Sequence, residues 1–156
     1  MKYLILSLFA IISTNSIAQT EEIDKVCNAY DEKIARAEEE EVPEEAPKME
    51  VSCQLTKRAI GPVNHKINIY FKEYEVEIGQ PGQDVFHKEA VIQKVEFTIS
   101  SVSYNITYSY YFDEGGILIK YAERSEGYNC LLKEVYFEEK EAIRIKQLAL
   151  TGEACI

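Results

Sequence analysis

The residues of this chain that could do chemistry are few, and none belongs to a catalytic motif. The two histidines are His65 and His87, and the many acidic residues fall on expected turns and at an expected helix end. Strand alternation places His65 on an apolar face, where it is either a general base or ligand or a histidine at the core edge. The sequence contains no motif for a nucleophilic serine, a zinc protease, a phosphate loop or a calcium loop. We therefore expect no catalytic residue, no cofactor and no enzyme, and a hydrolase with an unrecognised carboxylate pair stays as a further alternative.

The four cysteines favour disulfide chemistry over metal binding. They are Cys27, Cys53, Cys130 and Cys155. No pair has C-x-x-C spacing and neither histidine lies at a zinc-ligand spacing from a cysteine, so we expect no metal site. An even number of cysteines in an exported chain predicts two disulfides. Three pairings are possible, and closure of the shortest loops favours Cys27–Cys53 and Cys130–Cys155.

Tyrosine is the most unusual component of this sequence. The chain has 11 tyrosines and no tryptophan. Four of them fall within one short stretch: Tyr104, Tyr108, Tyr110 and Tyr111. On a strand the first three share one face and Tyr111 points to the other. Because tyrosine combines a large contact area with a polar tip, these four are candidate residues for binding a ligand or partner. Alternatively, they fill the sheet face under a helix.

The N-terminus predicts export from the cell that makes this protein. Residues 1–18 contain one basic residue, Lys2, followed by an apolar run and a polar stretch that ends in Ser16-Ile17-Ala18. This order is typical of a signal peptide of bacterial type, cleaved after Ala18. The apolar run is shorter than the roughly 20 residues that a membrane span requires. We expect a periplasmic or extracellular protein without a membrane span.

One helix and a series of strands must position these residues. Residues 19–42 are predicted to form an acidic helix, because apolar residues recur there at three- and four-residue steps: Ile23, Val26, Cys27, Tyr30, Ile34 and Ala37. Residues 43–48 are predicted to be a linker of proline and glutamate. Strands are then expected at 49–55, 63–78, 91–99, 106–112, 117–124, 130–138 and 142–150. A change of alternation near Lys72-Glu73 indicates a β-bulge.

The short connections between these strands favour antiparallel neighbours in a meander. Two similar segments, 110–120 and 135–146, are interpreted as two hairpins of that meander. The predicted class is α+β, with one N-terminal helix packed on a curled antiparallel sheet of about six to seven strands. Residues 49–156 are predicted to form one unit with the helix.

The net charge of the chain limits the classes of partner that it could bind. The formal net charge is −10, and residues 21–50 hold 12 acidic and 4 basic residues. This balance disfavours nucleic acid, which requires a basic surface. We expect an exported, non-enzymatic binding protein that recognises a partner through its Tyr-rich sheet surface, and its acidity would suit a cationic protein. The alternative is a periplasmic carrier that holds an apolar ligand in a cavity between helix and sheet.

Overall fold

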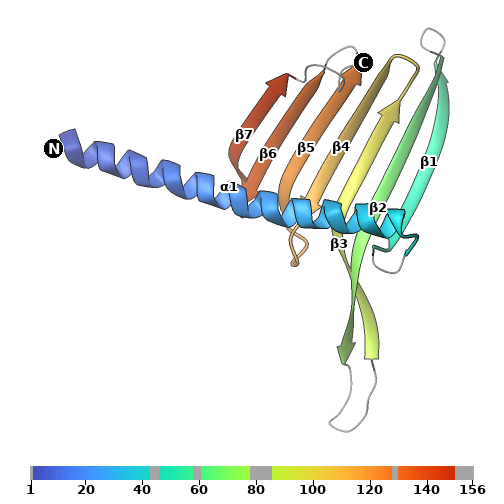
Figure 1. Ribbon diagram of the computed structural model, residues 1–156, viewed down its shortest axis with the longest axis horizontal. Coiled ribbons are helices and arrows are strands. Elements are labelled where there is room, and N and C mark those ends of the chain that lie inside the picture. The colour runs from blue at the N-terminus through green and yellow to red at the C-terminus, as the bar shows by residue number, and fades with distance from the viewer. Residues whose placement is uncertain (1, 43–45, 58–60, 78–85, 128–129, 150–156) are drawn as a thin grey trace.

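The computed structural model describes residues 2–42, 46–57, 61–77, 86–127 and 130–149. Within them the helix α1 (Lys2–Glu39) precedes seven strands. The strands are β1 (Lys48–Lys57), β2 (Gly61–Glu77), β3 (Phe86–Ser100), β4 (Tyr104–Phe112), β5 (Leu118–Gly127), β6 (Leu131–Glu138) and β7 (Glu141–Ala149). All seven form one antiparallel sheet in chain order, as Figure 1 shows. The predicted meander is confirmed, and the sheet is open rather than curled.

The expected β-bulge is present, but the extra residue is on the other strand. Tyr70 of β2 pairs with Lys94 of β3, and Phe71 pairs with Ile92, so Gln93 has no partner in the register. The strand β2 is paired without interruption through Lys72 and Glu73, so the insertion predicted there is wrong. Polar and apolar residues exchange faces beyond Phe71 without an extra residue in β2. Beyond this bulge β2 and β3 continue alone as a two-stranded ribbon that projects past α1 (Figure 1).

The two similar segments form two hairpins, β4–β5 and β6–β7. In the first turn the Asp113 carboxylate accepts hydrogen bonds from the amides of Gly115 and Ile117 at 2.9 and 2.8 Å. The second turn places Glu139 and Lys140 at φ values of 47° and 76°, where glycine or asparagine is usual. The resemblance between the segments therefore reflects architecture.

Helix α1 runs across the strands on one face of the sheet (Figure 1). Its first turns extend beyond β7, and its C-terminal end lies over β2 and β1. The helix ends in a Schellman-type motif: the amide of Val42 donates to the carbonyl of Ala37 at 3.0 Å, and Glu41 has a φ of 54°. The predicted helix end is thus confirmed within a few residues. The cleavage after Ala18 stays a prediction.

The side of α1 that contacts the sheet overlaps the predicted apolar stripe only in part. The most buried helix residues are Thr20, Cys27 and Ala37, and Asp24 and Asp31 lie between them on the same side. Cys27 and Ala37 belong to the expected stripe, whereas its other members are only partly buried: Ile23, Val26, Tyr30 and Ile34. Among the described residues no helix is long and apolar enough to span a membrane.

Candidate binding surface

The side chains beneath α1 form one row that alternates between cationic and tyrosine residues. Adjacent strands contribute Lys48, Tyr70, Lys94, Tyr111, Lys120, Tyr136 and Arg144 in register. Lysine or arginine comes from each odd-numbered strand and tyrosine from each even-numbered strand. A face that is usually apolar under a helix is here built from long polar side chains whose stems and rings supply the packing.

Three acidic residues of α1 match the lysines of this row. Asp24 contacts Lys120 at 2.7 Å, Asp31 contacts Lys94 at 2.8 Å, and Glu38 contacts Lys48 at 2.8 Å. The acids are seven residues apart, which is about 10.5 Å along a helix. Two strand spacings are about 9.6 Å. The repeat of the helix therefore meets every second strand, which explains why the lysines are on β1, β3 and β5.

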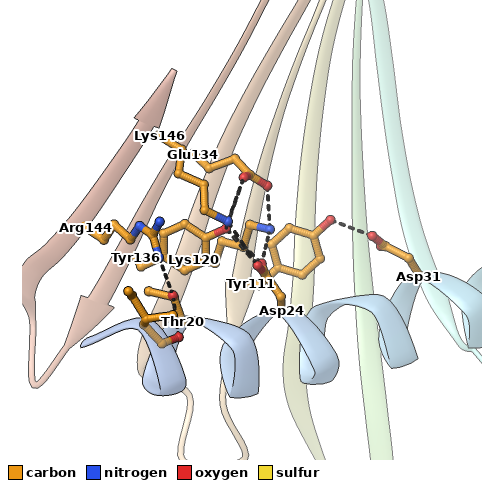
Figure 2. A network of polar contacts seen from close by, with 10 residues as sticks. Thr20, Asp24, Asp31, Tyr111, Lys120, Glu134, Tyr136, Arg144 and Lys146 are labelled. Carbon is orange, nitrogen blue, oxygen red and sulfur yellow. Dashed lines mark hydrogen bonds and ion pairs between the residues drawn. The ribbon is translucent and has the colours of Figure 1, made fainter. Parts of the chain in front are cut away.

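Asp24 is the centre of the densest part of this network (Figure 2). It accepts hydrogen bonds from Lys120 at 2.7 Å, Tyr136 at 2.9 Å and Lys146 at 3.3 Å. Burial acts to raise the pKa of Asp24, but these donors outweigh burial and the pKa lies below its usual value. Burial acts to lower the pKa of Lys120, but its bonds to Asp24 and Glu134 raise the pKa above its usual value.

These shifts indicate a structural role for the network. The pKa of Tyr136 is also raised, first by burial and then by its hydrogen bond to Asp24. The acid, the lysine and the tyrosine all titrate further from neutral pH than they do in water. A general acid or base instead needs a pKa close to the working pH. Among the residues described, no group of three potential ligands could hold a metal ion.

The opposite face of the sheet is covered by no described element, because α1 lies on the other side (Figure 1). Three rows of side chains cross this face, one residue from each strand. The first row is Met49, Ile69, Val95, Tyr110, Tyr121, Val135 and Ile145. The second is Val51, Ile67, Phe97, Tyr108, Glu123, Lys133 and Gln147. The third is Cys53, His65, Ile99, Ile106, Ser125, Leu131 and Ala149. We call these three rows the apolar face.

An aromatic ladder runs diagonally through the apolar face. His65 stacks on Phe97 with ring centres 5.8 Å apart, Phe97 on Tyr108 at 6.0 Å, and Tyr108 on Tyr121 at 6.4 Å. Tyr110 contacts the ring of Tyr121 at 5.2 Å in a tilted arrangement. The rings thus connect β2 with β5 and present a continuous partly exposed surface.

The four candidate tyrosines are divided between the two faces. Tyr108 and Tyr110 belong to the apolar face, and Tyr104 lies on the same side at the end of β4, opposite Gly127. Tyr111 is only 6% exposed beneath α1, where its hydroxyl donates to Asp31 at 2.8 Å. Alternation predicted this division, but the sequence could not show which face the helix covers. Phe97 and Tyr121 were missed because they lie on neighbouring strands.

His65 takes part in the ladder and not in a hydrogen-bonded catalytic pair. Its Nε2 atom is buried without a hydrogen-bond partner among the described residues. The hollows that adjoin α1 lie away from this face. One of about 430 Å³ is lined by Ile23, Val26, Tyr30 and Ile119 beside the helix, and another of about 400 Å³ lies near its C-terminal end.

The positions of the cysteines contradict one of the two predicted disulfides. Cys27 is a free, buried thiol on the side of α1 that contacts the sheet, and burial raises its pKa to about 12. Cys53 is a free, exposed thiol on the apolar face, so the sheet separates the two residues and the pairing Cys27–Cys53 is wrong. Short loop closure had favoured that pairing, but loop length does not report which face a side chain occupies. Cys130 is disulfide-bonded; Cys155 lies outside the described residues, so Cys130–Cys155 stays a prediction.

Comparison of the chain with protein-family models, with curated proteins and with solved structures found no match.

Proposed function

We propose that this chain is an exported, non-enzymatic binding protein that recognises its partner through the apolar face. The first row of that face carries the proposal, because all seven of its residues are apolar or aromatic. Met49 and Ile145, at the two ends of the row, are 54% and 63% exposed. Contiguous apolar surface of this extent on a soluble protein marks an interaction site.

The charge of the chain is separated from this surface. On the apolar face, the described charged residues are Glu123 and Lys133, which are directly opposite each other on β5 and β6. The acidic residues 38–41 instead belong to the end of α1 and the turn after it, on the other side of the sheet. A cationic partner, if there is one, would contact the helix side, whereas the apolar face suits an apolar partner.

The test is differential capture from the native host by the purified protein. The double variant Tyr108→Ala with Tyr110→Ala removes two rings from the apolar face, and Arg124→Ala on the helix side of β5 is its matched control. Truncation of central aromatic residues is expected to weaken binding by at least about tenfold. The same protein or lipid should be retained by the unaltered chain and the control but lost by the double variant. Equal retention by all three would exclude the apolar face as the binding site.

The carrier alternative is supported by the hollow beside α1, which has aliphatic residues on both the helix and β5. A carrier would retain one lipid or other apolar molecule in the same capture experiment. That molecule should be lost from a Val26→Asp variant and kept by the double tyrosine variant, so the two functions give opposite patterns.

A further inference from the structure

We infer that the apolar face is occupied by the same face of a second copy of this chain, so that two sheets form a sandwich. This inference rests on the proposed function, which assigns the apolar face to binding. It commits that face to one occupant, and four properties of the structure favour a second copy.

The first property is the size of the face. Seven strands about 4.8 Å apart, crossed by three rows about 6.8 Å apart, project an area of roughly 690 Å². A stable protein interface needs about 800 Å² of accessible surface from each partner, and accessible surface exceeds the projected area. One such face is therefore large enough to hold two copies together.

The second property is the shape of the face. The rows follow an open sheet from edge to edge, and the hollows that adjoin α1 are formed by other residues. Small-molecule sites are concave and enclose their ligand. Two open sheets instead pack face to face about 10 Å apart, with their strands within about 30° of each other.

The third property is the composition of the interior. Among the described residues, the buried aliphatic and cysteine side chains are Cys27, Ala37 and Val63, and the larger buried side chains are tyrosines and lysines. A domain of this length ordinarily gains its stability from a core of large apolar side chains. Here those side chains are on the apolar face, which becomes a core when a second sheet covers it.

The fourth property is the placement of charge and symmetry. The acidic helix of each copy would lie on the outside of the sandwich, away from the contact, so the net charge of −10 opposes association only at long range. In a meander of seven strands β4 is the middle strand. A twofold axis parallel to β4 and midway between the two sheets would place β1 of each copy over β7 of the other, which covers Met49 and Val51 with Ile145.

The test is the mass of the purified protein in solution, measured by light scattering and sedimentation from about 1 to 100 µM. We expect twice the mass of one chain. The double variant Val51→Lys with Ile145→Lys should dissociate at least about 100-fold more readily, because each lysine would be buried without a partner. Both positions are exposed in the single chain, at 53% and 63%, so the variant should fold.

The matched control is Ser52→Lys with Leu148→Lys, which adds the same charge on the same two strands but on the helix side. It should remain a dimer. A single-chain mass for the unaltered protein over the whole range overturns the inference without any variant. So does a double variant that remains a dimer.

Association of single chains with neutral phosphatidylcholine vesicles would also overturn the inference, in favour of a lipid surface. Failure of the inference that two copies form a sandwich is distinguishable from failure of the proposed function. A chain that is monomeric, yet loses a captured partner on double tyrosine substitution, still binds through the apolar face.

Discussion

At the scale of single residues, Gly127 occupies a position of the sheet where any side chain would both strain the backbone and clash with a neighbouring turn. It has a φ of 95°, and an added Cβ would lie 2.5 Å from the carbonyl oxygen of Ser103 and 3.1 Å from the Cα of Tyr104. Gly116 has a similar φ of 75°, but a Cβ there would meet open space. The pair therefore separates the cost of backbone conformation from the cost of a clash.

We predict that Gly116→Ala lowers the free energy of unfolding by about 1 kcal/mol, the cost of a left-handed conformation. Gly127→Ala should lower it by more, about 2–4 kcal/mol, because the β3–β4 turn must also move. Urea denaturation followed by circular dichroism measures both values. Equal losses for the two variants would contradict the proposed clash.

The turn at Glu139 and Lys140 is a second residue-scale feature, since both residues have positive φ without being glycine or asparagine. We predict that Lys140→Gly raises the free energy of unfolding by about 1 kcal/mol, because glycine adopts this conformation without strain. Lys133→Gly, inside β6, is the control and should lower stability, since glycine weakens a strand interior. Thermal unfolding of both variants tests the difference, and a loss of stability in Lys140→Gly would show that the turn is not strained.

At the scale of elements, the position of α1 on the sheet depends on ion pairs in register. We predict that Asp24→Asn lowers the free energy of unfolding by about 2–3 kcal/mol, because Lys120 and Lys146 each lose a charged hydrogen-bond acceptor. Glu32→Gln, on an exposed part of the same helix, should change it by less than about 0.5 kcal/mol. Denaturant unfolding gives both values. An equal effect of the two substitutions would mean that the network does not hold the helix.

The same network predicts how stability depends on pH. The folded pKa of Asp24 is lowered, so its contribution is present above its unfolded value of about 3.9 and is lost as pH falls below it. The pKa values of Lys94 and Lys120 are raised, so their contribution is present below about 10.4 and is lost as pH rises past it. The free energy of unfolding should be measured from about pH 3 to about pH 11, a range that includes both reference pKa values. It should be constant at intermediate pH and should fall at both the acidic and the alkaline end. Asp24→Asn should remove the acidic loss that is due to Asp24 and should also reduce the alkaline loss, because the bond to Asp24 raises the pKa of Lys120.

At the scale of the whole molecule, the sheet has parts of unequal stability. From Asn64 to Tyr70 the strand β2 is paired on both sides, but from Phe71 onward it pairs with β3 alone. A two-stranded ribbon is marginal in water. We predict that backbone amides from Glu73 to Val76 exchange with deuterium at least about tenfold faster than those from Asn64 to Ile69. Equal protection by mass spectrometry would show that an additional contact holds the ribbon.

Sequence periodicity could predict much of this architecture because the side-chain period of a strand is a local property. Each expected strand overlaps one of the observed strands, and the helix end and the two hairpins were located from turns and changes of period. The division of Tyr110 and Tyr111 between opposite faces also followed from alternation alone. The ladder did not, because Phe97 and Tyr121 approach Tyr108 only after three strands have paired.

The sequence by itself determined the order of the elements, the period of each strand and the two sets of side chains on opposite sides of the sheet. Only the tertiary structure decided which set the helix covers. The helix covers the set that contains the lysines, because the seven-residue repeat of Asp24, Asp31 and Glu38 pairs with lysines on alternate strands. That match is between a helix repeat and a strand spacing, so it exists only when the sheet is assembled.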